Sequence, residues 1–199
     1  MKYKNVVFDY GNVLGRFDPK FILKQFCDTE EDFPALYEAL YENWQALDEG
    51  SAEYGACIEK ALSRLPEHLH APAVAFFKNW YRYCTPMQES WELVRELKEQ
   101  KISVYLLSNA SAYFSEHAME ICSILECFDG IIFSGPNQCA KPESKIYQLL
   151  FETFQLKPEE CFFIDDNEEN IKAAKALGMD GIVFTGDVKA VKRGCRTKD

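Results

Sequence analysis

Close to its N-terminus the chain reads NVVFDYGN over residues 5–12. Residues 5–8 form a short run rich in β-branched and aromatic side chains, and this run stops abruptly at Asp9. Such a run, followed by the turn-forming Tyr10-Gly11-Asn12, predicts a buried strand that leads into a loop. We therefore expect Asp9 to stand at the carboxyl end of the first strand.

Four similar apolar runs follow along the chain. They cover residues 102–107, 130–133, 161–164 and 181–184. Helical periodicity fills the intervals between them, and strands that alternate with helices favour a parallel sheet covered on both faces. The predicted fold class is therefore α/β, with a Rossmann-like doubly wound parallel sheet as its core.

One long interval breaks this alternation, because residues 17–86 show only helical periodicity. Asp18-Pro19 resembles a helix start, with an N-cap residue followed by proline at the first helical position. We predict an inserted α-helical bundle, a cap domain, over residues 17–86. The core domain then consists of residues 1–16 and 87–199.

Composition narrows the class of protein. The 199 residues are 47% hydrophobic and carry a formal net charge of −10, which argues against nucleic-acid and anionic-membrane surfaces as partners. No segment approaches the roughly 20 apolar residues of a membrane span. The eight cysteines contain no C-x-x-C pair, a pattern that suits reduced thiols. We expect a cytoplasmic protein.

Polar residues stand at the ends of the predicted strands. These are Asp9, Ser108-Asn109 and Asp165-Asp166-Asn167, and Lys141-Pro142 precedes a predicted helix. In an open parallel sheet, ligands bind beyond the carboxyl ends of the strands. Carboxylate oxygens suit Mg²⁺, whereas a lysine and a hydroxyl suit phosphate oxygens. The set predicts a magnesium ion and an anionic substrate at one edge of the sheet.

These four segments resemble the motifs of the haloacid dehalogenase-like superfamily. In order, they are VFDYGNVL (residues 7–14), LLSN (106–109), KP (141–142) and FIDDN (163–167). More narrowly, the chain looks like the phosphatases of that superfamily that carry a helical cap after the first strand. LDEG, residues 47–50, also looks like the cap loop of the family.

The resemblance implies a metal site and a nucleophile. Asp9 would attack phosphorus and form an aspartyl-phosphate, which divides one hard displacement into two easier steps. Mg²⁺ would be held by Asp9, by the backbone carbonyl of Gly11 and by Asp166, with Asp165 acting through water or orienting its neighbours.

The resemblance also implies the residues that contact the substrate. Ser108 and the amide of Asn109 would bind phosphoryl oxygens, and Lys141 would offset negative charge around Asp9. Arg16 beside the hinge and Glu49 on the cap loop are further candidates for contacts with the substrate. We expect a small phosphorylated metabolite, with sugar phosphates favoured over nucleotides and flavin mononucleotide, and a chain that acts as a monomer or homodimer.

At one position the chain departs from the family pattern. Most such phosphatases have a second aspartate two residues after the nucleophile, where this chain has Gly11. That aspartate supplies general acid–base catalysis, typically worth ~10²–10⁴-fold in rate. Glu49 and Asp18 are candidates for its role, although Asp18 is also a natural helix cap.

Two alternatives stay open beside the phosphatase. A 2-haloacid dehalogenase uses the same nucleophile on carbon without Mg²⁺, but the acidic pair Asp165-Asp166 favours a metal. A non-catalytic binding or regulatory protein would explain the loss at Gly11, but it would not explain why Asp9 and Lys141 are both present.

Overall fold

The central sheet has five parallel strands in the order β5-β4-β1-β6-β7. The computed structural model describes residues 2–196, so both ends of the predicted core range extend beyond the described residues. The strands are β1 (Asn5–Phe8), β4 (Ser103–Ser108), β5 (Gly130–Phe133), β6 (Cys161–Asp165) and β7 (Asp180–Val183). The predicted α/β fold is confirmed, and every predicted strand lies within one residue of its observed position.

The sheet is doubly wound about β1. From β1 the chain order runs outward through β4 and β5 on one side, and through β6 and β7 on the other. The reversal of strand order beside β1 makes the carboxyl end of this strand a switch point, the usual place for a ligand in such sheets. Asp9 follows β1 directly.

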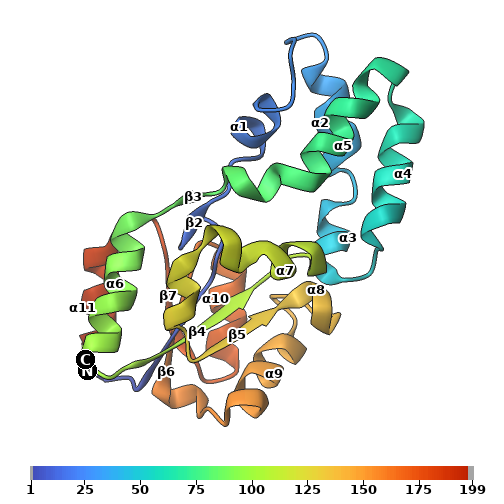
Figure 1. Ribbon diagram of the computed structural model, residues 1–199. Coiled ribbons are helices and arrows are strands. Elements are labelled where there is room, and N and C mark those ends of the chain that lie inside the picture. The colour runs from blue at the N-terminus through green and yellow to red at the C-terminus, as the bar shows by residue number, and fades with distance from the viewer. Residues whose placement is uncertain (1, 197–199) are drawn as a thin grey trace.

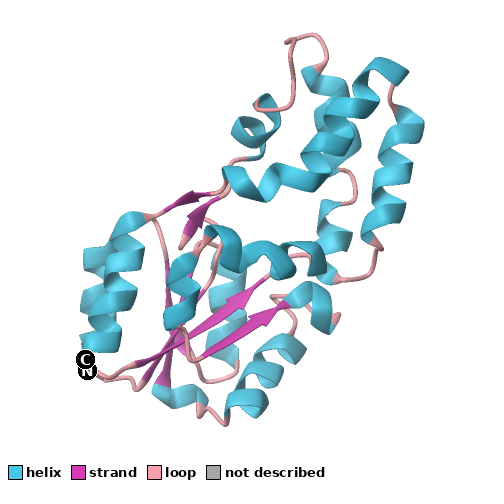
Figure 2. Cartoon of the chain, in the orientation of Figure 1, coloured by secondary structure: helices cyan, strands magenta, loops and turns pink. Residues whose placement is uncertain are grey.

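Helices cover both faces of the sheet (Figures 1 and 2). They are α6 (Gln88–Glu99), α7 (Ala112–Ile121), α8 (Ser134–Asn137), α9 (Ser144–Phe154), α10 (Glu168–Ala176) and α11 (Val188–Arg196), with short 3₁₀ turns η3 (Ser123–Cys127) and η4 (Pro158–Glu160). Because side chains alternate along a strand, Val6 and Phe8 pack with α6, α7 and α11, whereas Val7 packs with α9 and α10.

A second group of helices lies beyond the carboxyl ends of the strands (Figure 1). It contains α1 (Pro19–Lys24), α2 (Phe33–Tyr41), α3 (Trp44–Glu49), α4 (Tyr54–Arg64) and α5 (His70–Asn79), with 3₁₀ turns η1 (Glu67–Leu69) and η2 (Trp80–Tyr83). The carboxylate of Asp18 accepts hydrogen bonds from the amides of Lys20 and Phe21, both at 3.0 Å, and so caps α1.

Two short strands join this insert to the sheet domain. β2 (Gly15–Arg16) pairs antiparallel with β3 (Thr85–Pro86), so the chain enters and leaves the insert side by side. The predicted cap limits of 17–86 begin directly after β2 and end on the last residue of β3, and they stay a prediction. Among residues 2–196, no helix has the length and apolar character needed to cross a membrane.

The end of α3 also docks against the sheet domain. Ser134 at the start of α8 donates a hydrogen bond from its Oγ to the carbonyl oxygen of Asp48. Gly50 caps α3 with a φ of +71°, and a Cβ at this position would overlap the carbonyl oxygen of Gly135. Glycine is therefore required at Gly50 both for its backbone conformation and for the close approach.

Candidate active site

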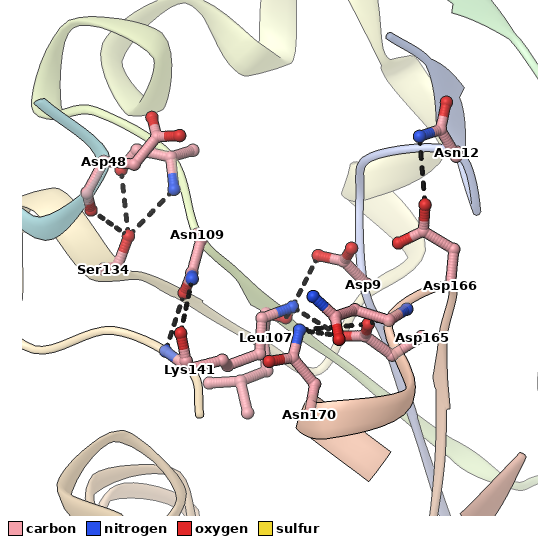
Figure 3. Close-up of polar contacts among 12 residues, drawn as sticks. Asp9, Asn12, Asp48, Leu107, Asn109, Ser134, Lys141, Asp165, Asp166 and Asn170 are labelled. Atoms are coloured by element: carbon pink, nitrogen blue, oxygen red, sulfur yellow. Dashed lines mark hydrogen bonds and ion pairs between the residues drawn. The ribbon is translucent and has the colours of Figure 1, made fainter. Parts of the chain in front are cut away.

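The carboxyl ends of three neighbouring strands bring the predicted polar residues together (Figure 3). Asp9 follows β1, and its amide donates to the carbonyl oxygen of Ile164 at 2.9 Å. Ser108 ends β4 and Asp165 ends β6, and both are buried. Parallel pairing of β4, β1 and β6 thus places Ser108, Asp9 and Asp165 on one edge of the sheet.

Lys141 lies buried at the centre of this group. Its Nζ donates to Asp9 Oδ1 at 2.7 Å, to Asp165 Oδ2 at 2.7 Å and to the carbonyl oxygen of Leu107 at 2.8 Å. All three ammonium protons therefore have acceptors. The side chain is only 1% exposed, so the ion pairs are shielded from solvent.

Asn109 fixes the backbone of Lys141. Its Oδ1 accepts from the Lys141 amide and its Nδ2 donates to the Lys141 carbonyl, both at 2.8 Å. The side chain of Asn109 is thus engaged in positioning the lysine. The predicted contact between the amide of Asn109 and a phosphoryl oxygen stays a prediction.

Asp165 is held on several sides. Asn170 donates from Nδ2 to both carboxylate oxygens of Asp165 at 3.0 Å, and the amide of Asn167 donates to Oδ1 at 2.8 Å. Asn170 comes from the first turns of α10 and is buried. Asp165 is therefore a fixed carboxylate, and Asn170 positions it directly.

Sequence reasoning missed the role of Asn12. Its Nδ2 donates to Asp166 Oδ2 at 3.0 Å, and its Oδ1 accepts from the amide of Phe17 at 3.2 Å. The backbone of Asn12 has a φ of +53°, a left-handed conformation that asparagine tolerates better than most residues. In the sequence, the only sign of this role is an asparagine in the turn after Asp9. That pattern predicts a turn, but it does not predict a hydrogen bond to Asp166.

The acidic residues fit a small, hard cation. Asp9, Asp165 and Asp166 each offer a carboxylate oxygen, and these oxygens all lie within 4.8 Å of one another. Two oxygens bound to one Mg²⁺ lie about 3–4 Å apart, so small side-chain adjustments bring the set around one ion. Three carboxylates also exceed the single positive charge of Lys141. Gly11, the predicted carbonyl ligand, lines one cavity together with Asp9 and Asp166.

Electrostatics couple the lysine to the nucleophile. Burial raises the pKa of Asp9 to about 6, since the opposing charge of Lys141 only partly offsets it and Asp165 and Asp166 add repulsion. Burial works against the charge of Lys141, but Asp9 and Asp165 outweigh this effect and raise its pKa. Lys141 therefore stays charged and keeps Asp9 largely ionised near neutral pH.

A cavity opens above Asp9 toward the insert. Its polar end contains Asp9, Ser108, Asn109 and Asp166. Aromatic residues also line the cavity, namely Tyr10, Phe17, Trp44, Trp80 and Phe114. These rings form one contiguous surface, with centroid distances of 4.7 Å for Trp44–Trp80 and 5.4 Å for Trp80–Phe114.

Two of the predicted substrate-contact residues, Arg16 and Glu49, are not among the residues that line this cavity. Arg16 is exposed on β2 and lines a neighbouring hollow beside Asn12 and Asp166. Glu49 accepts a hydrogen bond from Gln45 at 2.7 Å, and the preceding residue, Asp48, lines the cavity instead. Successive residues of a helix point about 100° apart, so only one of two adjacent acids can face the site.

The chain is similar to known proteins over most of its length. A family model for haloacid dehalogenase-like hydrolase matches residues 3–178. The sesquiterpene phosphatase astK of Aspergillus oryzae is 28% identical over 186 residues, or 92% of this chain and 90% of that protein. The (S)-2-haloacid dehalogenase of Pseudomonas sp. strain YL is 24% identical over 180 residues, or 87% of this chain and 75% of that protein.

A solved structure shares the fold. The HAD family enzyme BT-2542 of Bacteroides thetaiotaomicron, in complex with magnesium and inorganic phosphate, superposes with a TM-score of 0.67 and 22% identity. The match covers 93% of this chain and 96% of that chain. The likeness therefore extends over the sheet domain and the insert together.

Proposed function

The chain belongs to the haloacid dehalogenase-like hydrolases, and on that premise we propose that it is a Mg²⁺-dependent phosphohydrolase acting on a small phosphate monoester. The observation that carries this proposal is the buried Lys141, bonded at 2.7 Å to both Asp9 and Asp165 beside a third carboxylate, Asp166. A fixed nucleophile, a cation and a hard-metal donor set are the parts that phosphoryl transfer requires.

The residues divide the task between them. Asp9, Asp166 and the carbonyl of Gly11 would hold Mg²⁺, with Asp165 as a further or water-mediated ligand. The ion, when bound, neutralises charge between the phosphate and Asp9. Ser108 and the amide of Asn109 donate to phosphoryl oxygens, and Lys141 keeps Asp9 ionised and oriented.

The reaction proceeds in two displacements. A carboxylate oxygen of Asp9 attacks phosphorus, the bond to the leaving alcohol breaks, and an aspartyl-phosphate forms. Water then attacks this phosphorus, and the phosphorus–oxygen bond to Asp9 breaks. Asp9 is regenerated and inorganic phosphate leaves, while Lys141 stays paired with Asp165 through both steps.

The lining of the cavity favours an apolar leaving group. Five aromatic residues line the cavity beside the polar end, and Asp48 is the one acidic side chain among the described lining residues outside that end. A sugar presents many hydroxyls that need partners, and leaving polar groups unpaired in a closed site costs binding energy. We therefore place isoprenoid and aryl phosphates first and sugar phosphates second. The name of the related sesquiterpene phosphatase agrees with this order.

Dehalogenation is the second candidate. It is favoured by the relationship to a 2-haloacid dehalogenase and by the absence of a second aspartate at position 11, since a dehalogenase needs none. The bond from Asn12 that holds Asp166 beside Asp9 counts against it, because attack on carbon has no use for a third carboxylate. The phosphohydrolase proposal also includes two predictions from the sequence, a small metabolite as the substrate and a monomer or homodimer as the oligomeric state.

A substrate panel tests the proposal. Purified protein is assayed with an isoprenoid phosphate, an aryl phosphate, a sugar phosphate and a nucleotide, in Mg²⁺ and in EDTA, beside Asp9→Asn. We expect phosphate release that requires Mg²⁺ and is lost in Asp9→Asn, while far-UV circular dichroism stays unchanged. Release of halide from a 2-haloacid, with no phosphate from any monoester, would contradict the proposal.

A further inference from the structure

The cavity contains an acid that the proposed two-step reaction has not used. Among the described lining residues, the carboxylates are Asp9, Asp166 and Asp48. The first two belong to the acidic cluster at the sheet edge. Asp48 comes from the opposite side, near the end of α3 in the insert. In an in-line displacement the leaving oxygen departs away from the nucleophile, here away from Asp9 and toward the insert.

The position of Asp48 is fixed from the sheet domain. Ser134 Oγ donates to the carbonyl oxygen of Asp48 and accepts from the amide of Ala110 at 2.8 Å (Figure 3). Ala110 directly follows Ser108-Asn109, so the same loop carries the phosphate-binding groups and anchors Asp48. The amide of Ser111 in this loop also donates to the carboxyl group of Asp48.

We propose that Asp48 is the general acid and base of the reaction and takes the role left open at Gly11. This inference rests on the proposed phosphohydrolase function. As Asp9 forms its bond to phosphorus, the bond to the leaving oxygen breaks, and its electron pair takes the proton of the Asp48 carboxyl group to release the alcohol. Asp48, now a carboxylate, accepts a proton from the water that attacks the aspartyl-phosphate, and so regains its starting form.

The surroundings of Asp48 suit a proton donor. Burial raises the pKa of its carboxyl group to about 8, and the charges of Asp9 and Glu49 add to this effect. The amide of Ser111 works in the opposite direction, since it favours the ionised form. A raised pKa favours the protonated form of Asp48 near neutral pH, whereas an exposed aspartate would have lost its proton.

The space around Gly11 allows the proposed role of Asp48 to be tested by introducing an acid at position 11. A Cβ built there would have one neighbour within 4 Å, Asp9 Oδ2 at 3.9 Å. The backbone of Gly11 is outside the left-handed region, so a side chain is tolerated. An aspartate can therefore be introduced at Gly11, and it would place an acid beside the same reacting group.

The test is the single-turnover rate of alcohol release by Asp48→Asn, which isolates the first step. We expect a ~10²-fold or larger loss for an alkyl phosphate, a much smaller loss for p-nitrophenyl phosphate, whose leaving group needs no proton, and little change in KM. Asp28→Asn makes the same change at an exposed position of the insert and should match wild type. Gly11→Asp in the Asp48→Asn background should recover alkyl phosphate hydrolysis.

Other outcomes separate the two proposals. Equal losses for both leaving groups, or a rise in KM alone, would overturn the role of Asp48 and make it a substrate-binding residue. Wild-type activity in Asp48→Asn would overturn it as well, while the phosphohydrolase function would stand. Wild-type protein inactive on every monoester would instead refute the function itself. If Asp48→Asn does not fold, Asp48→Ser gives the same comparison.

Discussion

Replacement of Lys141 by methionine removes the one cation from the buried acidic group. Methionine approximates the length and volume of the lysine stem, so the change is mainly one of charge and hydrogen bonding. Lys141 makes three contacts of 2.7–2.8 Å from a side chain that is 1% exposed, and its partners Asp9 and Asp165 have side chains 11% and 0% exposed. Removing one partner of a buried ion pair typically costs about 3–5 kcal/mol.

We expect the upper part of that range for Lys141→Met, because two carboxylates lose their counter-ion at once. The assay is urea unfolding at pH 7.5 in EDTA, so that no divalent cation replaces the lysine. Lys172→Met is the matched control. Its side chain is 57% exposed and pairs with Glu168 and Glu169 on the surface of α10, so its loss should leave the free energy of unfolding nearly unchanged.

The penalty should also depend on pH. The pKa of Asp9 is about 6 in the folded protein, against an ordinary value of 3.8. As pH falls, Asp9 therefore takes up a proton at a higher pH in the folded state than in the unfolded state. A protonated Asp9 no longer repels Asp165, and without the lysine this protonation begins at still higher pH. The difference in unfolding free energy between wild type and Lys141→Met should therefore shrink from pH 8 to pH 5. A loss no greater than that of Lys172→Met, or one that grows as pH falls, would refute the reasoning.

Two further substitutions test how the site is supported. Asn170→Ala removes both amide bonds to Asp165, and we expect a ~10–100-fold loss of Mg²⁺ affinity or kcat, measured by titrating activity with the metal; unchanged affinity and kcat would mean that Asp165 needs no orienting partner. Gly50→Ala combines a left-handed φ with overlap on the Gly135 carbonyl, and should destabilise the protein by about 1–3 kcal/mol in thermal unfolding. Gly186→Ala, with a φ of +91° and open space around it, measures the conformational part alone, so equal losses would show that the close approach contributes nothing.

The strands of the sheet and the polar residues at their carboxyl ends could be predicted from the sequence. Short apolar runs that end on polar residues constrain both the strand and the side of the sheet to which its carboxyl end points. Asp9, Ser108 and Asp165 therefore came together as predicted from strand ends alone. The role of the Asn109 side chain could not be predicted from the sequence, because its two hydrogen bonds to the backbone of Lys141 join segments 32 residues apart.

The insert was less predictable at the level of single residues. Helical periodicity in residues 17–86 indicates which faces are apolar, but it does not fix how a helix is rotated above a site that other segments form. Asp48 and Glu49 are neighbours with similar chemistry, and only the docking of α3 on Ser134 and Gly135 brings Asp48 to the cavity. Arg16 illustrates the same limit, since one residue next to a hinge can face either side of a two-stranded ribbon.

The pairing of β2 with β3 has a consequence for how the two parts of the chain depend on each other. Gly15 pairs with Pro86 and Arg16 with Thr85, so the insert leaves and rejoins the sheet domain at adjacent points. The insert of five helices therefore connects β2 to β3 in the same way as the turn of a hairpin connects its two strands. The entropic cost of closing such a connection grows only slowly with its length, by about 0.6 kcal/mol per doubling. The helices can therefore be lengthened, shortened or exchanged over evolution at small cost to the sheet, while the edge that carries Asp9 stays intact.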